Sequence, residues 1–96
     1  MDVEELGNGE IYVVDVENYP AFKSIFTSKG GKFLKNRMYF SGSFEKQNNG
    51  SWATTDYNMS FRLATPQEKE HLLQCIAAGK YVDYVGSKLS FNYLIL

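Results

Sequence analysis

Three residues with metal-binding or nucleophilic side chains share one face of a predicted helix. Glu68, His71 and Cys75 are spaced at i, i+3 and i+7 in the segment RLATPQEKEHLLQCIAAG, residues 62–79. In a helix this spacing brings them onto neighbouring turns. A carboxylate, an imidazole and a thiolate together suit a zinc ion. A thiol four residues from an imidazole also suits an activated nucleophile.

A structural role is the alternative for these residues, and the sequence favours it. Structural zinc sites draw mostly on Cys and His, and the chain has one residue of each type. A nucleophile also needs an orienting group and an oxyanion site from other elements, which the sequence does not supply. We therefore expect Cys75 to be a small buried apolar residue beside Ile76, with His71 at the edge of the apolar stripe. The sequence predicts no catalytic residue, no metal site and no cofactor.

The helix has a start signal and a stop signal. Thr65 is a suitable N-cap, and Pro66 suits the first helical position, where its missing N–H is not needed. Glu68 stands three residues after Thr65, so the pair forms a capping box. Gly79 is suited to the left-handed conformation that often ends a helix. These signals predict a helix at about residues 66–78. Its apolar stripe consists of Leu72, Leu73 and Ile76, with Ala77 beside them.

Most of the remaining chain has the alternating or β-branched pattern of strands. The segment 21–27 fits either a strand or a short helix, and 28–31 (SKGG) and 45–51 are expected to be turns or loops. Gly42 suggests a bulge or bend within its strand. The predicted strands are residues 10–16, 37–44, 58–63, 80–85 and 88–96.

Length and composition predict one α+β domain, residues 1–96. We expect a strongly bent antiparallel sheet, or a small open β-barrel, of five to six strands with the helix packed on it. Hydrophobic residues make up 44% of the chain, which is enough for a real core. The acidic residues after Met1 are unlike a signal peptide, and no apolar stretch is long enough to span a bilayer. These features favour a cytoplasmic protein that does not enter the membrane.

Charge is unevenly distributed along the chain. Residues 1–17 hold six acids and no base, whereas residues 18–44 hold five bases and no acid. Such asymmetry favours either an interaction face or two segments that pair with each other on neighbouring strands. Lysines interleaved with aromatic residues in the segment 22–40 also suit a nucleic acid or a nucleotide. The slightly acidic net charge of −1 argues against that alternative.

The leading functional interpretation is a non-catalytic module that binds a protein partner. Such a surface combines exposed aromatic side chains with a charged rim. Tyr19 and the loop 45–51 are expected near it, and the oligomeric state stays open, a homodimer included. The candidate binding residues are Lys23, Lys32, Lys35, Arg37, Tyr39, Trp52 and Tyr57.

The helical cap carries a resemblance to a known group of proteins. The sequence ATPQEK at residues 64–69 resembles the "ATPEEK"-type cap of small accessory proteins encoded by phages and prophages of gut bacteria. In those proteins a compact β-domain precedes the capped helix. The resemblance covers about a fifth of the chain, residues 62–82. It implies an accessory protein that acts in the cytoplasm of a bacterial host and binds a host protein, for example to antagonise defence. It implies no catalytic residue.

Overall fold

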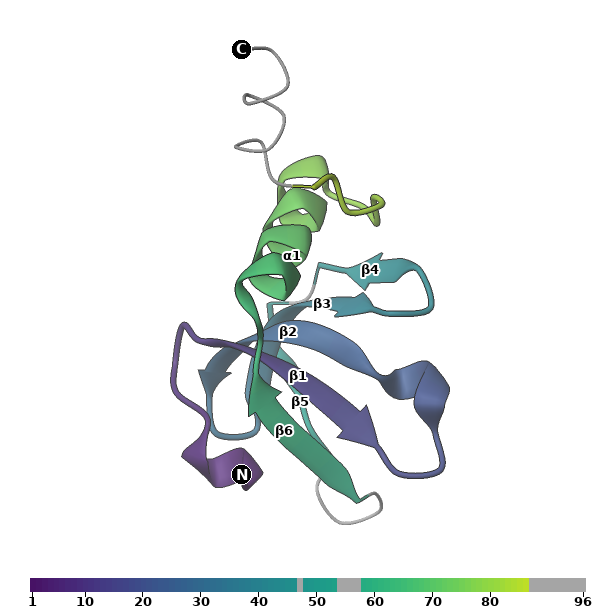
Figure 1. Ribbon diagram of the computed structural model, residues 1–96. Helices are drawn as coiled ribbons and strands as arrows, with labels where there is room; N and C mark the ends of the chain where they lie inside the picture. Colours follow the sequence, from purple (N-terminus) through teal and green to yellow (C-terminus); the bar gives the residue numbers. More distant parts are fainter. Residues whose placement is uncertain (47, 54–57, 87–96) are drawn as a thin grey trace.

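An open antiparallel sheet of six strands carries a single helix in this computed structural model, which describes residues 1–46, 48–53 and 58–86 (Figure 1). Two short 3-10 helices, η1 (Val3–Glu5) and η2 (Pro20–Phe22), precede the strands β1 and β2. The α-helix α1 spans Pro66–Ala78. The strands are β1 (Ile11–Val16), β2 (Ser24–Gly30), β3 (Phe33–Tyr39), β4 (Ser43–Glu45), β5 (Gly50–Ser51) and β6 (Met59–Leu63).

In this sheet the first strand, β1, pairs with the last strand, β6. Its strand order is β4-β3-β2-β1-β6, and β5 pairs with the early part of β3. Every pairing is antiparallel. The expected α+β class, with a bent open sheet and one packed helix, is therefore confirmed.

One face of the sheet is concave and encloses an aromatic core. The ring of Phe26, in the middle of the sheet, contacts those of Trp52 and Phe61 at centroid distances of 5.0 and 6.0 Å. Trp52 follows β5 and Phe61 lies on β6, yet their ring centroids are 5.9 Å apart. Because these rings come from opposite sides of the strand order, the sheet must curl around them. We call this cluster the concave core: Leu6, Tyr12, Val14, Val16, Phe26, Leu34, Trp52 and Phe61.

The opposite face of the sheet is covered by α1. Leu72 and Cys75 are the fully buried residues of the helix, and they pack on Val13, Ile25 and Met38. Figure 1 shows α1 lying over one end of the sheet, above β2 and β3. An isolated helix of this length is marginal in water, so its stability comes from this contact. The buried members of this helix-side core are Val13, Ile25, Met38, Ala64, Leu72 and Cys75.

The helix begins and ends where the sequence predicts. The Thr65 side chain accepts a hydrogen bond from the backbone N–H of Glu68, whose carboxylate accepts from the Thr65 N–H. Gly79 ends the helix in the left-handed conformation, with φ of 69°. The capping box and the C-terminal glycine are both confirmed.

A bulge in β3 changes which face its side chains occupy. Phe26 pairs with Arg37 and Thr27 pairs with Lys35, so Asn36 is the extra residue and has a positive φ of 52°. In a regular strand Leu34 and Met38 would lie on the same face. Here Leu34 joins the concave core and Met38 joins the helix-side core. An inserted residue has this effect because side chains alternate along a strand.

Two strand predictions are wrong. Residues 37–44 do not form one strand, because the chain turns at 40–42 between β3 and β4, and Gly42 has φ of 111°. Residues 80–85 form no strand, because their backbone bonds to helix side chains: Gln74 exchanges two hydrogen bonds with Val85. The segment 21–27, for which a strand or a short helix was expected, contains the end of the short helix η2 followed by the start of the strand β2. The predicted strand 88–96 lies outside the described residues.

Candidate functional site

A pocket of about 300 Å³ opens on the concave side of the sheet. Its walls come from the end of β1, η2, the second half of β3, β5 with the residues after it, and the start of β6. Three of the residues singled out from the sequence, Arg37, Tyr39 and Trp52, lie together in it. The lining residues are Val16, Phe22, Arg37, Tyr39, Ser51, Trp52, Ala53 and Met59.

Arg37 is held between two aromatic rings in the pocket wall. Its guanidinium carbon lies 4.3 Å from the centre of the Tyr39 ring and 4.6 Å from that of Trp52. Its Nε donates to Ser24 Oγ at 2.8 Å and its Nη2 to the Phe22 carbonyl at 3.0 Å. Burial lowers the pKa of Arg37, an effect that Tyr39 and Glu45 oppose. A guanidinium still keeps its proton in such a site, so the pocket wall is positively charged.

Tyr39 links Arg37 to an acidic residue. Burial raises the pKa of the Tyr39 hydroxyl, and its hydrogen bond to Glu45 raises the pKa further, while the charge of Arg37 lowers it. The net direction is upward, so the phenol stays protonated near neutral pH. Glu45 also pairs with Arg37 across β3 and β4 in the sheet register. These contacts hold both side chains in place without leaving either poised for proton transfer.

Trp52 is a core residue with one unsatisfied polar atom. We expected its ring at the surface, and this is wrong, because the side chain is only 7% exposed and packs on Phe26 and Phe61. The bent sheet closes over the ring, and the sequence did not indicate which side chains the bend would cover. Its indole Nε1 is buried and has no hydrogen-bond acceptor among the described residues. A buried N–H in this state is rare and costs stability.

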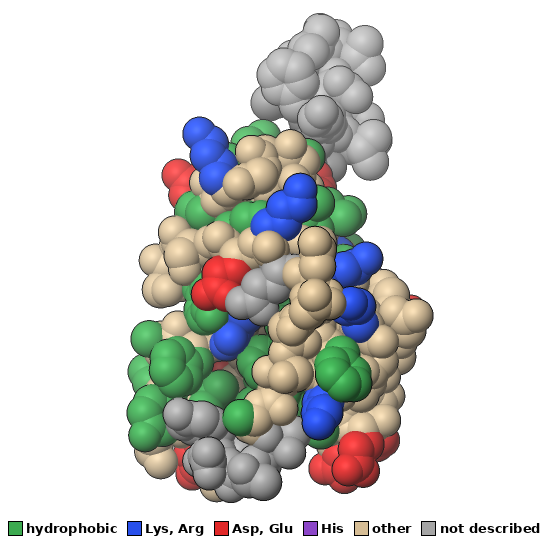
Figure 2. All heavy atoms as spheres, turned by 180° about the vertical axis from the view of Figure 1, so that it is seen from behind, with side chains coloured by type: hydrophobic (Ala, Val, Ile, Leu, Met, Phe, Trp, Pro, Cys, Tyr) green, Lys and Arg blue, Asp and Glu red, His purple; other side chains and the backbone are tan. Residues whose placement is uncertain are grey.

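An exposed pair of stacked rings stands beside the pocket. Tyr19 and Phe22 stack at 5.5 Å with planes 10° apart, across the short helix η2. Both residues are exposed, and Phe22 also lines the pocket. Tyr19 is therefore exposed as expected. Figure 2, which views the molecule from behind, shows apolar side chains gathered in one lower corner.

The lysines of the basic segment do not join Arg37. Lys35 pairs with Thr27, on the other side of the Asn36 bulge, and so lies on the face that carries the helix. Lys23 reaches Asp15 at 3.9 Å and lies 5.0 Å from the Phe40 ring centre. Lys32 lies in the turn between β2 and β3, near the Phe33 ring. Tyr57 lies outside the described residues.

The acidic and basic segments therefore meet without forming a continuous pairing. The Asp15–Lys23 contact joins them across β1 and the start of β2. Lys29 instead donates to the carbonyl of Asn48 at 2.5 Å. In Figure 2 the Lys and Arg side chains are spread over the visible face rather than gathered in one patch.

Two apolar pocket residues had no functional role in our sequence interpretation. Val16 and Met59 are register partners in the pairing of β1 with β6. They are 43 positions apart in the chain, and only this pairing brings them to the same wall of the pocket. No local sequence pattern identifies either residue as part of a pocket. Alternation predicts that a side chain points inward, but it does not predict which other side chains it contacts.

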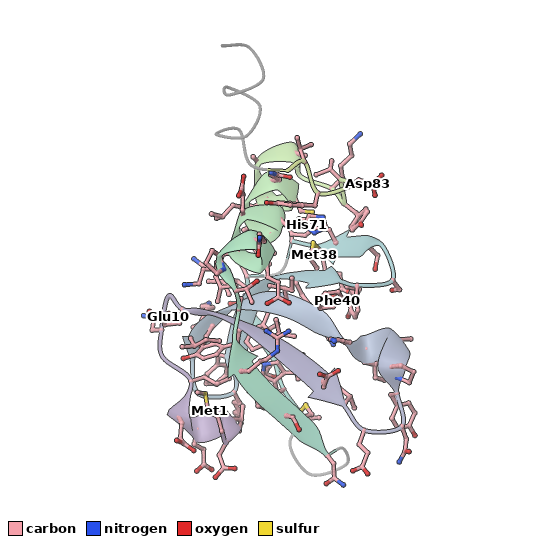
Figure 3. The ribbon with its side chains drawn as sticks, in the orientation of Figure 1. Met1, Glu10, Met38, Phe40, His71 and Asp83 are labelled. Atoms are coloured by element: carbon pink, nitrogen blue, oxygen red, sulfur yellow. The ribbon has the colours of Figure 1, made fainter. Side chains whose placement is uncertain are left out.

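His71 and Cys75 hold the segment that follows the helix. The Val82 carbonyl can only accept, so His71 Nε2 donates to it, at 2.7 Å. The His71 ring also contacts the rings of Tyr81 and Tyr84 at 5.6 Å each. The Val82 N–H lies 3.5 Å from Cys75 Sγ, which lies 3.4 Å from Met38 Sδ. Figure 3 shows His71 and Met38 between α1, the strands β3 and β4 and the segment that carries Asp83.

The third residue of the helical group, Glu68, is committed elsewhere. Its carboxylate accepts two hydrogen bonds from Arg62, at 2.8 and 2.9 Å, and caps the helix. Within residues 1–46, 48–53 and 58–86, no group of three His, Cys, Asp or Glu side chains is placed to hold a metal ion. The contacts of all three residues are structural ones.

Comparisons with known proteins add no family. A scan against protein-family models found no match, and searches of curated proteins and of solved structures found none that is significant. In the part of the chain that the structure describes, no helix combines the length and apolar character needed to cross a membrane.

Proposed function

We propose that this protein is a non-catalytic binding module that takes a segment of a protein partner into the concave pocket. The observation that carries the proposal is the position of Arg37, between the rings of Tyr39 and Trp52 in the pocket wall. Arg, Tyr and Trp are the residue types that dominate binding energy in protein interfaces. Their hydrogen bonds and ring contacts hold them rigid before a partner arrives, which lowers the entropy cost of binding.

The surroundings of the pocket also suit a protein partner. The exposed Tyr19–Phe22 stack adds apolar contact area at its rim. Val16 and Met59 supply an apolar wall inside. An apolar centre with a polar and charged periphery is the usual anatomy of a protein interface.

Binding is favoured over catalysis by the state of the pocket's ionisable groups. Tyr39 has a raised pKa, and Arg37 keeps its proton although burial lowers its pKa. General acid–base chemistry needs a group that titrates near the working pH. Neither side chain meets that requirement, whereas both supply directional contacts to a ligand.

The biological setting proposed here rests on the helical cap. The ATPQEK cap resembles that of phage and prophage accessory proteins, and we assign the protein to that role, acting on a host protein in the bacterial cytoplasm. The β-domain followed by a capped helix has the order of elements that the resemblance implies.

An affinity capture with matched variants tests the proposal. Tagged wild-type protein is incubated with bacterial lysate, and bound proteins are identified by mass spectrometry. Phe22→Ala removes an exposed ring of the pocket, whereas Lys35→Glu changes a charge on the opposite face. We expect a specific partner that Phe22→Ala loses and Lys35→Glu retains. Equal capture by both variants places the binding surface outside the pocket and contradicts the proposal.

Nucleic-acid or nucleotide binding through residues 22–40 is the second candidate. An arginine plane stacked on aromatic rings is a feature that such sites use, and Arg37 has it. Phosphate contacts make log affinity fall steeply and linearly with log salt concentration. Recovery of nucleic acid with such a salt slope, and of no protein, would favour this candidate over the first.

A further inference from the structure

We infer that the pocket selects a partner segment in which an Asp or Glu side chain lies next to an apolar one. This inference rests on the proposed function and specifies its ligand. The carboxylate would lie against Arg37 and Trp52, and the apolar side chain against Val16 and Met59. All four residues line the same pocket.

The charge of Arg37 supports the acidic half of this ligand. Arg37 donates hydrogen bonds to two neutral oxygens, those of Ser24 and Phe22. Burial lowers the pKa of Arg37, and Tyr39 and Glu45 oppose this shift. A carboxylate entering the pocket supplies the charged acceptor with which a guanidinium makes its strongest hydrogen bonds.

The indole of Trp52 forms part of the same pocket wall. Its Nε1 is buried and has no acceptor within the described residues. Its ring also lies against the Arg37 guanidinium. Because Nε1 is buried, the donor that a ligand meets at this wall is the Arg37 guanidinium, with the Trp52 ring packed against it.

The remaining walls support the apolar half. Val16 and Met59 face each other across the β1–β6 pairing, and the exposed Phe22 continues the apolar surface to the rim. A free carboxylate ion leaves this surface in contact with water. A peptide that places an aliphatic side chain next to its carboxylate buries the apolar surface as well, and burial of apolar area is the main favourable term in association.

Acidic groups near the pocket limit how much negative charge a ligand can bring. Glu45 reaches the Tyr39 hydroxyl, and Glu17, next to Val16, accepts from Asn58 at 2.8 Å. Lys35, Lys23 and Lys32 lie away from Arg37, so they do not form a cationic track beside it. One carboxylate suits this balance, whereas a chain of phosphates meets repulsion from the two acids. An acidic peptide is therefore favoured over a nucleic acid.

Trp52 makes the inference directly measurable. It is the single tryptophan of the chain, so tryptophan emission, excited selectively over that of the seven tyrosines, reports on the pocket wall. The probes are capped pentapeptides with Leu-Asp or Leu-Glu at the centre, their amide counterparts Leu-Asn and Leu-Gln, and an Ala-Asp peptide. We expect a saturable change in emission with the Leu-Asp or Leu-Glu peptide. Its affinity should exceed that of the matching amide, and that of Ala-Asp, by at least about tenfold.

Two variants separate the pocket from general electrostatics. Arg37→Gln should reduce the preference for the acidic peptide over its amide to less than about threefold, because the charge-assisted bond is gone. Lys35→Gln removes the same charge two residues away on the opposite face and should leave the preference intact. Circular dichroism and the unfolding midpoint check that each variant is folded. Met59→Ala, which keeps Arg37, should reduce the advantage of Leu-Asp over Ala-Asp.

Several outcomes would overturn the inference. These are equal affinity for acid and amide peptides, equal loss of preference in Lys35→Gln and Arg37→Gln, and no saturable change up to about 1 mM peptide. If Phe22→Ala still loses a captured partner while acid and amide peptides bind alike, the proposed function stands and the ligand class is wrong. Tighter binding of a short oligonucleotide than of any peptide, with a steep salt slope, would assign the pocket to phosphate instead.

Discussion

The guanidinium carbon of Arg37 lies 4.6 Å from the centre of the Trp52 ring. Arg37 belongs to β3, whereas Trp52 follows β5, a strand that pairs with the opposite end of β3. The contact therefore depends on two features: the bulge that turns Arg37 toward the concave face, and the curl that brings the Trp52 ring over it.

Arginine at position 37 is not replaceable by lysine. Arg37→Lys keeps the charge but loses the forked hydrogen bonds to Ser24 and Phe22 and the stacking between two rings. We expect the free energy of unfolding to fall by about 1–3 kcal/mol. Urea denaturation followed by circular dichroism measures it. An unfolding midpoint equal to that of wild type would show that the hydrogen bonds do not stabilise the fold.

The Asn36 bulge requires a residue that accepts a positive φ. Asn36 has φ of 52°, where a β-branched side chain is strained. We expect Asn36→Val to destabilise the protein by about 1–2 kcal/mol more than Asn36→Gly does. Thermal and urea unfolding of the two variants give the comparison. Equal stabilities would mean that the backbone at this position is not left-handed.

Deletion of Asn36 tests the functional consequence of the bulge. Removing the extra residue makes Lys35 and Arg37 neighbours in a regular strand, where neighbours lie on opposite faces, so Arg37 and Tyr39 stay on the concave face. We expect any ligand that quenches Trp52 in the wild type to bind the deletion variant as well. Loss of binding by a folded deletion variant would show that the bulge does more than set the face of the pocket residues.

The helix cap should weaken in acid. Hydrogen bonds from Arg62, despite opposition from desolvation, lower the pKa of Glu68 from its usual 4.5 to about 2. Because the pKa is lower in the folded state, the stabilisation is complete above pH 4.5 and is lost as the pH falls toward 2. Glu68→Gln lacks this charge, so its stability deficit should shrink across that range. The pair is partly exposed, and we expect an effect of up to about 1 kcal/mol.

Urea unfolding of wild type and Glu68→Gln at a series of pH values measures that deficit. Arg62→Met serves as the control, because it removes the other partner of the same ion pair. Its deficit should follow the same pH dependence. A deficit that stays constant from pH 5 to pH 2 would contradict the lowered pKa.

The helix should behave as a packed structural element. Leu72 is fully buried in the helix-side core, so Leu72→Ala should cost about 2–5 kcal/mol. Cys75→Ala removes a smaller buried side chain and should cost less. A chelator should leave the melting temperature of wild type unchanged, as measured by differential scanning fluorimetry. A fall of many degrees on chelation would restore the zinc interpretation of Glu68, His71 and Cys75.

The bounds of the helix and the class of the fold were predictable because their signals are local. Thr65, Pro66 and Glu68 act within one turn of each other, and Gly79 acts at the end of the same helix. A run of β-branched residues likewise predicted β1, and alternation of apolar residues predicted β6. The prediction of a strand at 80–85 was wrong because aromatic and β-branched residues suit an extended backbone whether it pairs with a strand or with helix side chains such as Gln74.

The site was predictable only in part. The sequence gives the type of each residue directly, but the face of the sheet on which its side chain lies depends on the strand pairing. Arg37, Tyr39 and Trp52 were identified by their chemistry, yet the sequence did not separate them from Lys23 and Lys35. One extra residue, Asn36, reverses the face of every later side chain in β3, and no composition rule marks it.

Burial and pairing were decided by tertiary structure alone. Trp52 is in the core because the sheet curls, and Val16 meets Met59 because β1 pairs with β6. These contacts join residues that are distant in the chain, so they exist only when the whole sheet has closed around them. The sequence by itself therefore determined the capped helix, the strand-forming segments and the chemistry available for binding. The tertiary structure decided which of those side chains meet, because strand register and sheet curvature are properties of the assembled sheet.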